Sequence, residues 1–76
     1  MVTVTENSND AGPFWTFTTT EKTQFGFEAW VTLNENRDYI AVVRSGRAYR
    51  RTMRVYPELA SAIAFVTEWV TKEVAL

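Results

Sequence analysis

The sequence contains no cysteine and no histidine among its 76 residues. These absences exclude disulfides, thiol nucleophiles, imidazole general bases and the Cys/His zinc sites found in many small domains. The serines, Ser8, Ser45 and Ser61, have no histidine to activate them, and the acidic residues lack the spacing of a metal-binding loop. We therefore expect a protein that is not an enzyme and that binds no cofactor and no metal.

Long hydrophobic runs are also missing. No stretch approaches the roughly 20 apolar residues of a membrane span, and the first residues lack the basic and apolar regions of a secretory signal. We expect a cytoplasmic protein with no membrane partner, located in the host cytoplasm if the chain is viral. With 46% hydrophobic and 22% charged residues, the composition is that of a folded domain. Such a short chain buries only roughly 60–65% of its surface, so self-association would add to its stability.

Charge is unevenly distributed along the chain, although the net charge is only −1. Residues 1–36 hold five acidic residues and one lysine, whereas residues 37–54 hold six arginines and one aspartate. Arginine is the cation best suited to stacking and to bidentate contact with carboxylate or phosphate. We interpret Arg44 and Arg47 as a basic edge, either an anion-binding edge or a solvated edge strand whose charge prevents aggregation.

Turn-forming residues divide the chain into segments. Residues 1–12 are expected to form a flexible arm, because residues 6–13 are polar and rich in breakers, although Val2 and Val4 also suit a sheet edge. Runs with strand composition follow at Phe14–Thr20, Gln24–Leu33, Asp38–Arg44 and Arg47–Val55.

A helix is predicted from Pro57-Glu58 to about Ala75, since proline suits a first turn and glutamate the positive end of the helix dipole. Apolar residues recur there at helical spacing: Leu59, Ala62, Ile63, Phe65, Val66, Trp69, Val70 and Val74. Glu68 and Lys72 are predicted to form a surface ion pair.

These segments predict an α+β fold over residues 13–76, a four-stranded antiparallel β-meander followed by one C-terminal α-helix on one sheet face (β-β-β-β-α). One helix covers only one face of such a sheet, so the second face is open.

The short separators predict the register of the strands. A two-residue Ser45-Gly46 turn pairs Arg44 with Arg47, and a four-residue loop at 34–37 pairs Leu33 with Asp38. This register directs Ile40, Tyr49, Arg51 and Val55 toward the helix. It predicts a core that includes Phe27, Val31, Val42, Met53, Ile63 and Val66.

On the open face the same register predicts a binding face of Phe14, Trp30, Tyr39, Arg50, Thr52 and Arg54. Trp30 and Arg50 lie in one cross-strand row with the small Ala41 between them, which favours a cation–π contact. Exposed rings and arginines are typical of protein interfaces, and also of surfaces that stack single-stranded bases. The small negative net charge and the presence of only two lysines favour the protein interface.

The strand order followed by a helix, with residues 51–63 forming strand, Pro-Glu and amphipathic helix, is similar to the PC4-type single-stranded-DNA-binding domains, which work as dimers. The similarity is one of topology, and the Ser45-Gly46 turn and the scarcity of lysine depart from it, so no functional residue is transferred. We expect a non-enzymatic, dimeric binding module, an adaptor, subunit or inhibitor, including a viral one, that uses its open sheet face for protein–protein interaction. The alternative is a protein that binds single-stranded DNA or RNA on that face.

Overall fold

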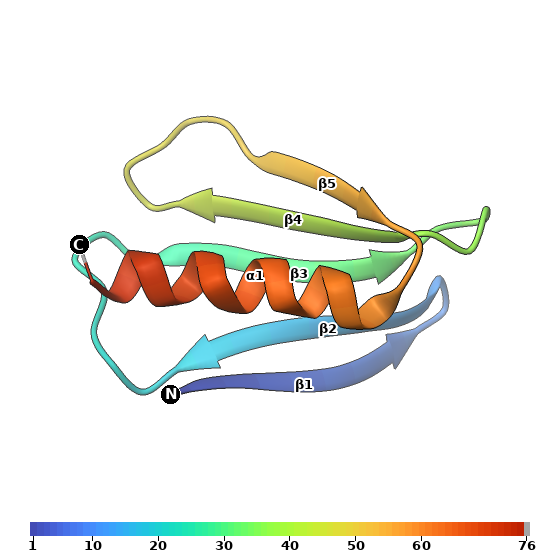
Figure 1. Cartoon of the computed structure of the whole chain (residues 1–76), viewed down its shortest axis with the longest axis horizontal. Helices are drawn as coiled ribbons and strands as arrows, with labels where there is room; N and C mark the ends of the chain where they lie inside the picture. Colours follow the sequence, from blue (N-terminus) through green and yellow to red (C-terminus); the bar gives the residue numbers. More distant parts are fainter. Residues whose placement is uncertain (76) are drawn as a thin grey trace.

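In the computed structural model, which describes residues 1–75, the chain forms a five-stranded antiparallel sheet with one helix lying across one face (Figure 1). The strands are β1 (Val2–Asn9), β2 (Gly12–Thr19), β3 (Phe27–Leu33), β4 (Tyr39–Ser45) and β5 (Thr52–Tyr56), adjacent in that order, and the helix is α1 (Leu59–Val74). The α+β class, the antiparallel meander and the C-terminal helix are confirmed, whereas the predicted number of strands is one too low. Leu76, the last residue of the predicted domain, lies outside the described residues.

The additional strand, β1, replaces the flexible arm predicted for residues 1–12. It pairs with β2 along its whole length, from Val2 opposite Thr19 to Asn9 opposite Gly12. The side-chain Oδ1 of Asn9 accepts a hydrogen bond from the backbone N–H of Ala11 at 2.9 Å, and Gly12 has a φ of 118°. The breaker-rich segment therefore contains a two-residue hairpin turn at residues 10–11, followed by a glycine where a positive φ is required.

The core lies between α1 and the sheet and has small side chains at its centre. Ala62, Val66 and Val70, four residues apart on α1, are fully buried. They form one cluster with the equally buried Val31 and Ala41 of β3 and β4. Small residues let the helix approach the sheet closely, and aromatic pairs surround this centre: Trp15 with Tyr39, Phe27 with Trp69 and Tyr56 with Phe65.

The predicted register between β3 and β4 is wrong by one residue. Leu33 pairs with Tyr39 instead of Asp38, because the intervening loop holds five residues. Within this loop Arg37 has a left-handed backbone with a φ of 64°, and the Asn34 side chain accepts a hydrogen bond from the Asp38 N–H at 2.9 Å. A shift of one residue moves every side chain of a strand to the opposite face.

The shift decides which residues of β4 and β5 lie under the helix. Ala41 and Val43 pack in the core, whereas Val42 is buried on the opposite side of the sheet. Met53 pairs with Val42, and Val55 with Ile40, so both point away from α1 and remain 63% and 59% exposed. The prediction of Met53 as a core residue is therefore wrong.

Four of the other five predicted core residues pack in the core or against it. Val31 and Val66 are fully buried, and Phe27 and Ile63 are half-buried against the core.

The connection from β4 to β5 is not the predicted two-residue turn. The last paired residues are Val43 and Thr52, so Arg44 does not face Arg47 across a tight hairpin. Gly46 instead lies against the loop between β2 and β3, where its N–H donates to the Gly26 carbonyl at 2.8 Å. A Cβ at position 46 would lie 1.7 Å from the backbone oxygen of Phe25, so this close approach requires glycine.

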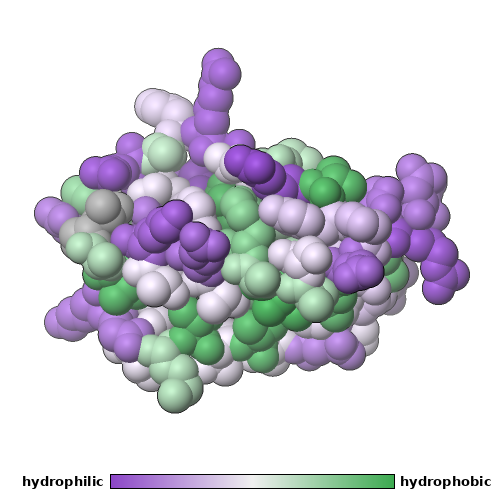
Figure 2. Space-filling model, viewed as in Figure 1, coloured by the Kyte–Doolittle hydropathy of each residue, from purple (hydrophilic) through white to green (hydrophobic). Residues whose placement is uncertain are grey.

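The helix begins at Leu59, with Glu58 in an extended conformation as its N-cap and Pro57 preceding it. The predicted ion pair between Glu68 and Lys72 is present at 3.3 Å. On the face that α1 covers, apolar surface appears in small areas separated by polar ones (Figure 2). Within residues 1–75, no helix combines the length and the hydrophobicity needed to cross a membrane.

Candidate binding face

The open face is the side of the sheet turned away from α1. Side chains alternate between the faces of a strand, so it carries the residues between the core positions: Thr3, Thr5, Asn7, Phe14, Thr16, Thr18, Glu28, Trp30, Thr32, Ile40, Val42, Arg44, Met53 and Val55. The half over β1 and β2 is mostly threonine. The half over β3, β4 and β5 carries the apolar patch, which we define as Trp30, Ile40, Val42, Met53 and Val55.

The apolar patch consists of two adjacent cross-strand rows. Trp30, Val42 and Met53 form one row, and Ile40 and Val55 lie side by side in the next. Val42, at the centre, is only 6% exposed, whereas the β5 residues of the patch are mostly exposed. The patch is therefore contiguous and extends to the edge strand β5.

An arginine–glutamate network borders the patch at one end. The Arg44 guanidinium donates to both carboxylate oxygens of Glu28, from Nη2 at 3.0 Å and from Nε at 3.2 Å, and Arg51 donates from Nε at 3.3 Å. The hydrogen bond from Arg44 lowers the pKa of Glu28, and the same contact raises the pKa of Arg44. The Glu28 carboxylate therefore holds both guanidinium groups at this end of the patch.

Arg51, not Arg50, supplies the cation for Trp30. Its guanidinium carbon lies 5.4 Å from the centre of the Trp30 ring. The predictions that Arg51 points toward the helix and that Arg50 shares a row with Trp30 are both wrong, because the wide connection places both arginines before β5 begins. In β5 the residue beside Ala41 is Arg54.

We call the connection from β4 to β5, residues 46–51, the basic loop. It contains three arginines, and Arg44, near the end of β4, donates from Nη1 to the Ala48 carbonyl at 3.0 Å and so holds the loop closed. Arg47 stacks over Phe25 at 5.4 Å, and Tyr49 is fully exposed. Of the predicted basic-edge residues, Arg44 thus lies in β4 and Arg47 in the basic loop, and Arg50 lies exposed between Arg47 and β5.

Three residues of the predicted binding face lie on the helix side of the sheet. Tyr39 packs its ring against Trp15 at 5.7 Å, Arg54 lies over Phe65 at 5.4 Å, and Thr52 pairs with the core residue Val43. The cause is again the one-residue shift in the pairing of β4 with β3, because β5 pairs with β4 and is shifted with it. The structure brings Phe14 and Trp30 to the open face as predicted.

Sequence reasoning missed Ile40, Met53 and Val55 as surface residues of the open face. The available signal was β4 itself, where residues 39–43 are apolar without alternation. Such a run is typical of a strand with apolar surroundings on both faces.

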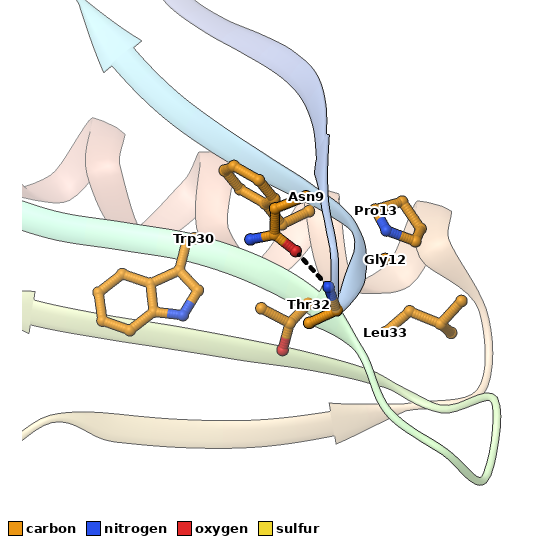
Figure 3. A pocket seen from close by; sticks show the side chains of 8 residues that line it. Asn9, Gly12, Pro13, Trp30, Thr32 and Leu33 are labelled. Atoms are coloured by element: carbon orange, nitrogen blue, oxygen red, sulfur yellow. Dashed lines mark hydrogen bonds between the residues drawn. The ribbon is translucent and has the colours of Figure 1, made fainter.

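A shallow pocket of about 250 Å³ extends the open face toward the turn between β1 and β2 (Figure 3). Its walls include Phe14, Pro13, Trp30, Thr32 and Leu33. The rings and aliphatic side chains form an apolar wall, and the Thr32 hydroxyl supplies a polar group. The pocket therefore suits a protruding apolar side chain better than a charged ligand.

The end of the sheet next to this pocket is acidic. The turn at 10–11 and the loop at 34–38 lie together there, opposite the basic loop (Figure 1). They carry Asp10, Glu35 and Asp38 against Arg37. The open face is thus bounded by opposite charges at the two ends of its strands.

In comparisons with known proteins, no family model, no curated protein and no solved structure matches the chain significantly. Its function is therefore inferred from the open face itself.

Proposed function

We propose that the chain is a non-enzymatic binding module that docks on a protein through the open face of its sheet. The observation that carries this proposal is the apolar patch, where the exposed Met53 and Val55 share with Trp30 a face that α1 does not cover. A contiguous exposed apolar surface rimmed by polar residues is typical of interaction sites.

The energetics favour docking. Burial of the exposed parts of Met53 and Val55 contributes roughly 1–2 kcal/mol each, because complete burial of such a side chain is worth about 1.5–3 kcal/mol. Trp30 and Arg51 belong to the residue types that dominate binding energy at interface centres. The contact between them at 5.4 Å favours binding, because it reduces the side-chain freedom that remains to be lost when a partner docks.

The size and composition of the chain support a role as an adaptor, subunit or inhibitor in the cytoplasm, in a host cell if the chain is viral. In each role the chain recognises a protein surface and performs no chemistry.

Site-specific photo-crosslinking tests the proposal. A photoreactive residue at Val55 on the open face should form crosslinks to a discrete protein in the cells that produce the chain, whether another copy or a different protein. The same residue at Ala64, exposed on α1, is the matched control and should form none. Adding Trp30→Asp should abolish the crosslink at Val55, provided that circular dichroism shows an intact fold. Equal crosslinking from both positions, or none from Val55, would contradict the proposal.

A second candidate function, binding of single-stranded DNA or RNA, is favoured by the basic loop. There Arg47 and Arg50 lie near the fully exposed Tyr49, and a stacked base contributes about 1–3 kcal/mol. Titration of fluorescent dT and rU oligomers at low and moderate salt should then give an affinity that falls steeply with salt and with Tyr49→Ala. No binding at tens of micromolar protein in low salt would exclude it.

A further inference from the structure

We propose that the partner covering the open face is a second copy of this chain, packed face to face about a two-fold axis that lies between the sheets and perpendicular to their strands. The inference rests on the proposed function, because it names the occupant of the same face. Two independent features of the face, the position of the apolar patch and the distribution of charge, select this arrangement.

The first feature is the position of the apolar patch on one half of the sheet. Two identical sheets stacked face to face have two symmetric choices of in-plane axis. An axis along the strands places β1 over β5 of the other copy, so that the threonines of β1 and β2 in one copy face the apolar patch of the other. An axis perpendicular to the strands places each strand over its own equivalent, so that the patch meets the patch.

The second feature is the opposite charge at the two ends of the strands. The perpendicular axis reverses the strand direction in the second copy, so the basic loop of each chain meets the acidic end of the other (Figure 1). The axis along the strands would instead place both basic loops at one end of the dimer and both acidic ends at the other, so that no basic loop meets an acidic end. One axis therefore satisfies the apolar and the electrostatic requirement, and the other satisfies neither.

The dimensions of the face agree with a stable dimer. The molecule extends 35 by 23 Å in the plane viewed in Figure 1, which contains the strands. A face of this size is comparable to the roughly 800 Å² that each partner buries in a standard protein interface. Sheets packed in this way lie about 10 Å apart, within reach of Trp30 and Met53 from both sides.

Charge exchange between the ends tests the arrangement by sedimentation velocity of the purified chain over a range of micromolar concentrations. The wild type should dimerise, and Arg50→Glu and Glu35→Arg should each raise the dimer Kd by about tenfold or more. The double variant carries the same net charge as the wild type and again places opposite charges against each other across the interface. Its Kd should therefore return to within about threefold of the wild-type value. With like ends together, neither single variant would weaken the dimer.

Two further variants separate the contribution of the face from effects on the fold. Val55→Asp should sediment as a monomer while its circular dichroism shows an intact fold. Ala64→Asp, on the exposed side of α1, should leave the dimer intact. A wild-type chain that stays monomeric at high micromolar concentration would overturn the inference, as would a dimer that Val55→Asp leaves intact or charge exchange that gives no recovery. If a monomer still crosslinks from Val55 to a different protein, only the dimer inference fails. If Val55 gives no crosslink at all, the proposed function fails as well.

Discussion

A matched pair of substitutions, Val43→Ala and Val55→Ala, tests the register that separates the core from the open face. The side chain of Val43 is 1% exposed beneath α1, whereas that of Val55 is 59% exposed on the opposite side of the sheet. Each substitution removes two methyl groups, worth about 0.8 kcal/mol each when buried, and in the core it also leaves a cavity. We therefore expect Val43→Ala to lower the free energy of unfolding by about 2–3 kcal/mol and Val55→Ala by less than about 0.5 kcal/mol.

Urea denaturation followed by tryptophan fluorescence measures both effects, and for a domain of this size the larger one corresponds to a fall in Tm of roughly 10–20 °C. Because the proposed dimer would add concentration-dependent stability, the comparison is made at several protein concentrations. The effect of Val43→Ala should be the same at each concentration, and any effect of Val55→Ala should disappear on dilution. If Val55→Ala proves as costly as Val43→Ala in the dilute protein, the strand register described here is wrong.

Three other predictions follow from individual contacts. Gly46→Ala should cost about 1–3 kcal/mol in urea denaturation, because its Cβ would overlap a backbone oxygen 1.7 Å away. Ala62→Leu should cost a similar amount by overpacking the fully buried centre of α1, whereas Ala64→Leu on the exposed side should change stability by less than about 0.5 kcal/mol. Since Arg44 lowers the pKa of Glu28 in the folded state, the contact stabilises the fold above the usual glutamate pKa of 4.5 and is lost as the pH falls below it. Thermal melts should thus show a smaller loss of Tm on acidification for Glu28→Gln than for the wild type.

The helix α1 and the strand β2 were predictable because their patterns are local. Apolar residues at helical spacing after Pro57 identify α1, and the buried alternation of Trp15 and Phe17 places β2 with its correct face toward the core. Such patterns depend only on which face of one element is buried. Assignments based on them therefore remain correct when another segment of the chain is assigned wrongly.

The face of β4 was not predictable from its composition, since residues 39–43 are apolar at every position. In such a strand only the preceding loop determines which side chains reach the core. The left-handed conformation of Arg37 adds one residue to that loop, and nothing in an arginine indicates a positive φ. The same error assigned Tyr39 and Arg54 to the open face and placed Val55 under the helix.

The two faces of β4 have different surroundings, because one helix cannot enclose a five-stranded sheet. A helix of 16 residues is about 24 Å long but only about 10 Å wide, whereas five strands span roughly 20 Å. On the helix side, aromatic rings such as Tyr39 fill the space beside α1, so that the core is complete within one chain. On the open face, the side chains of neighbouring strands cover Val42, but Met53 and Val55 at the edge remain exposed. Successive positions of β4 therefore lie in different surroundings: Ala41 and Val43 pack beneath α1, and Ile40 and Val42 lie on the face that we propose binds a partner.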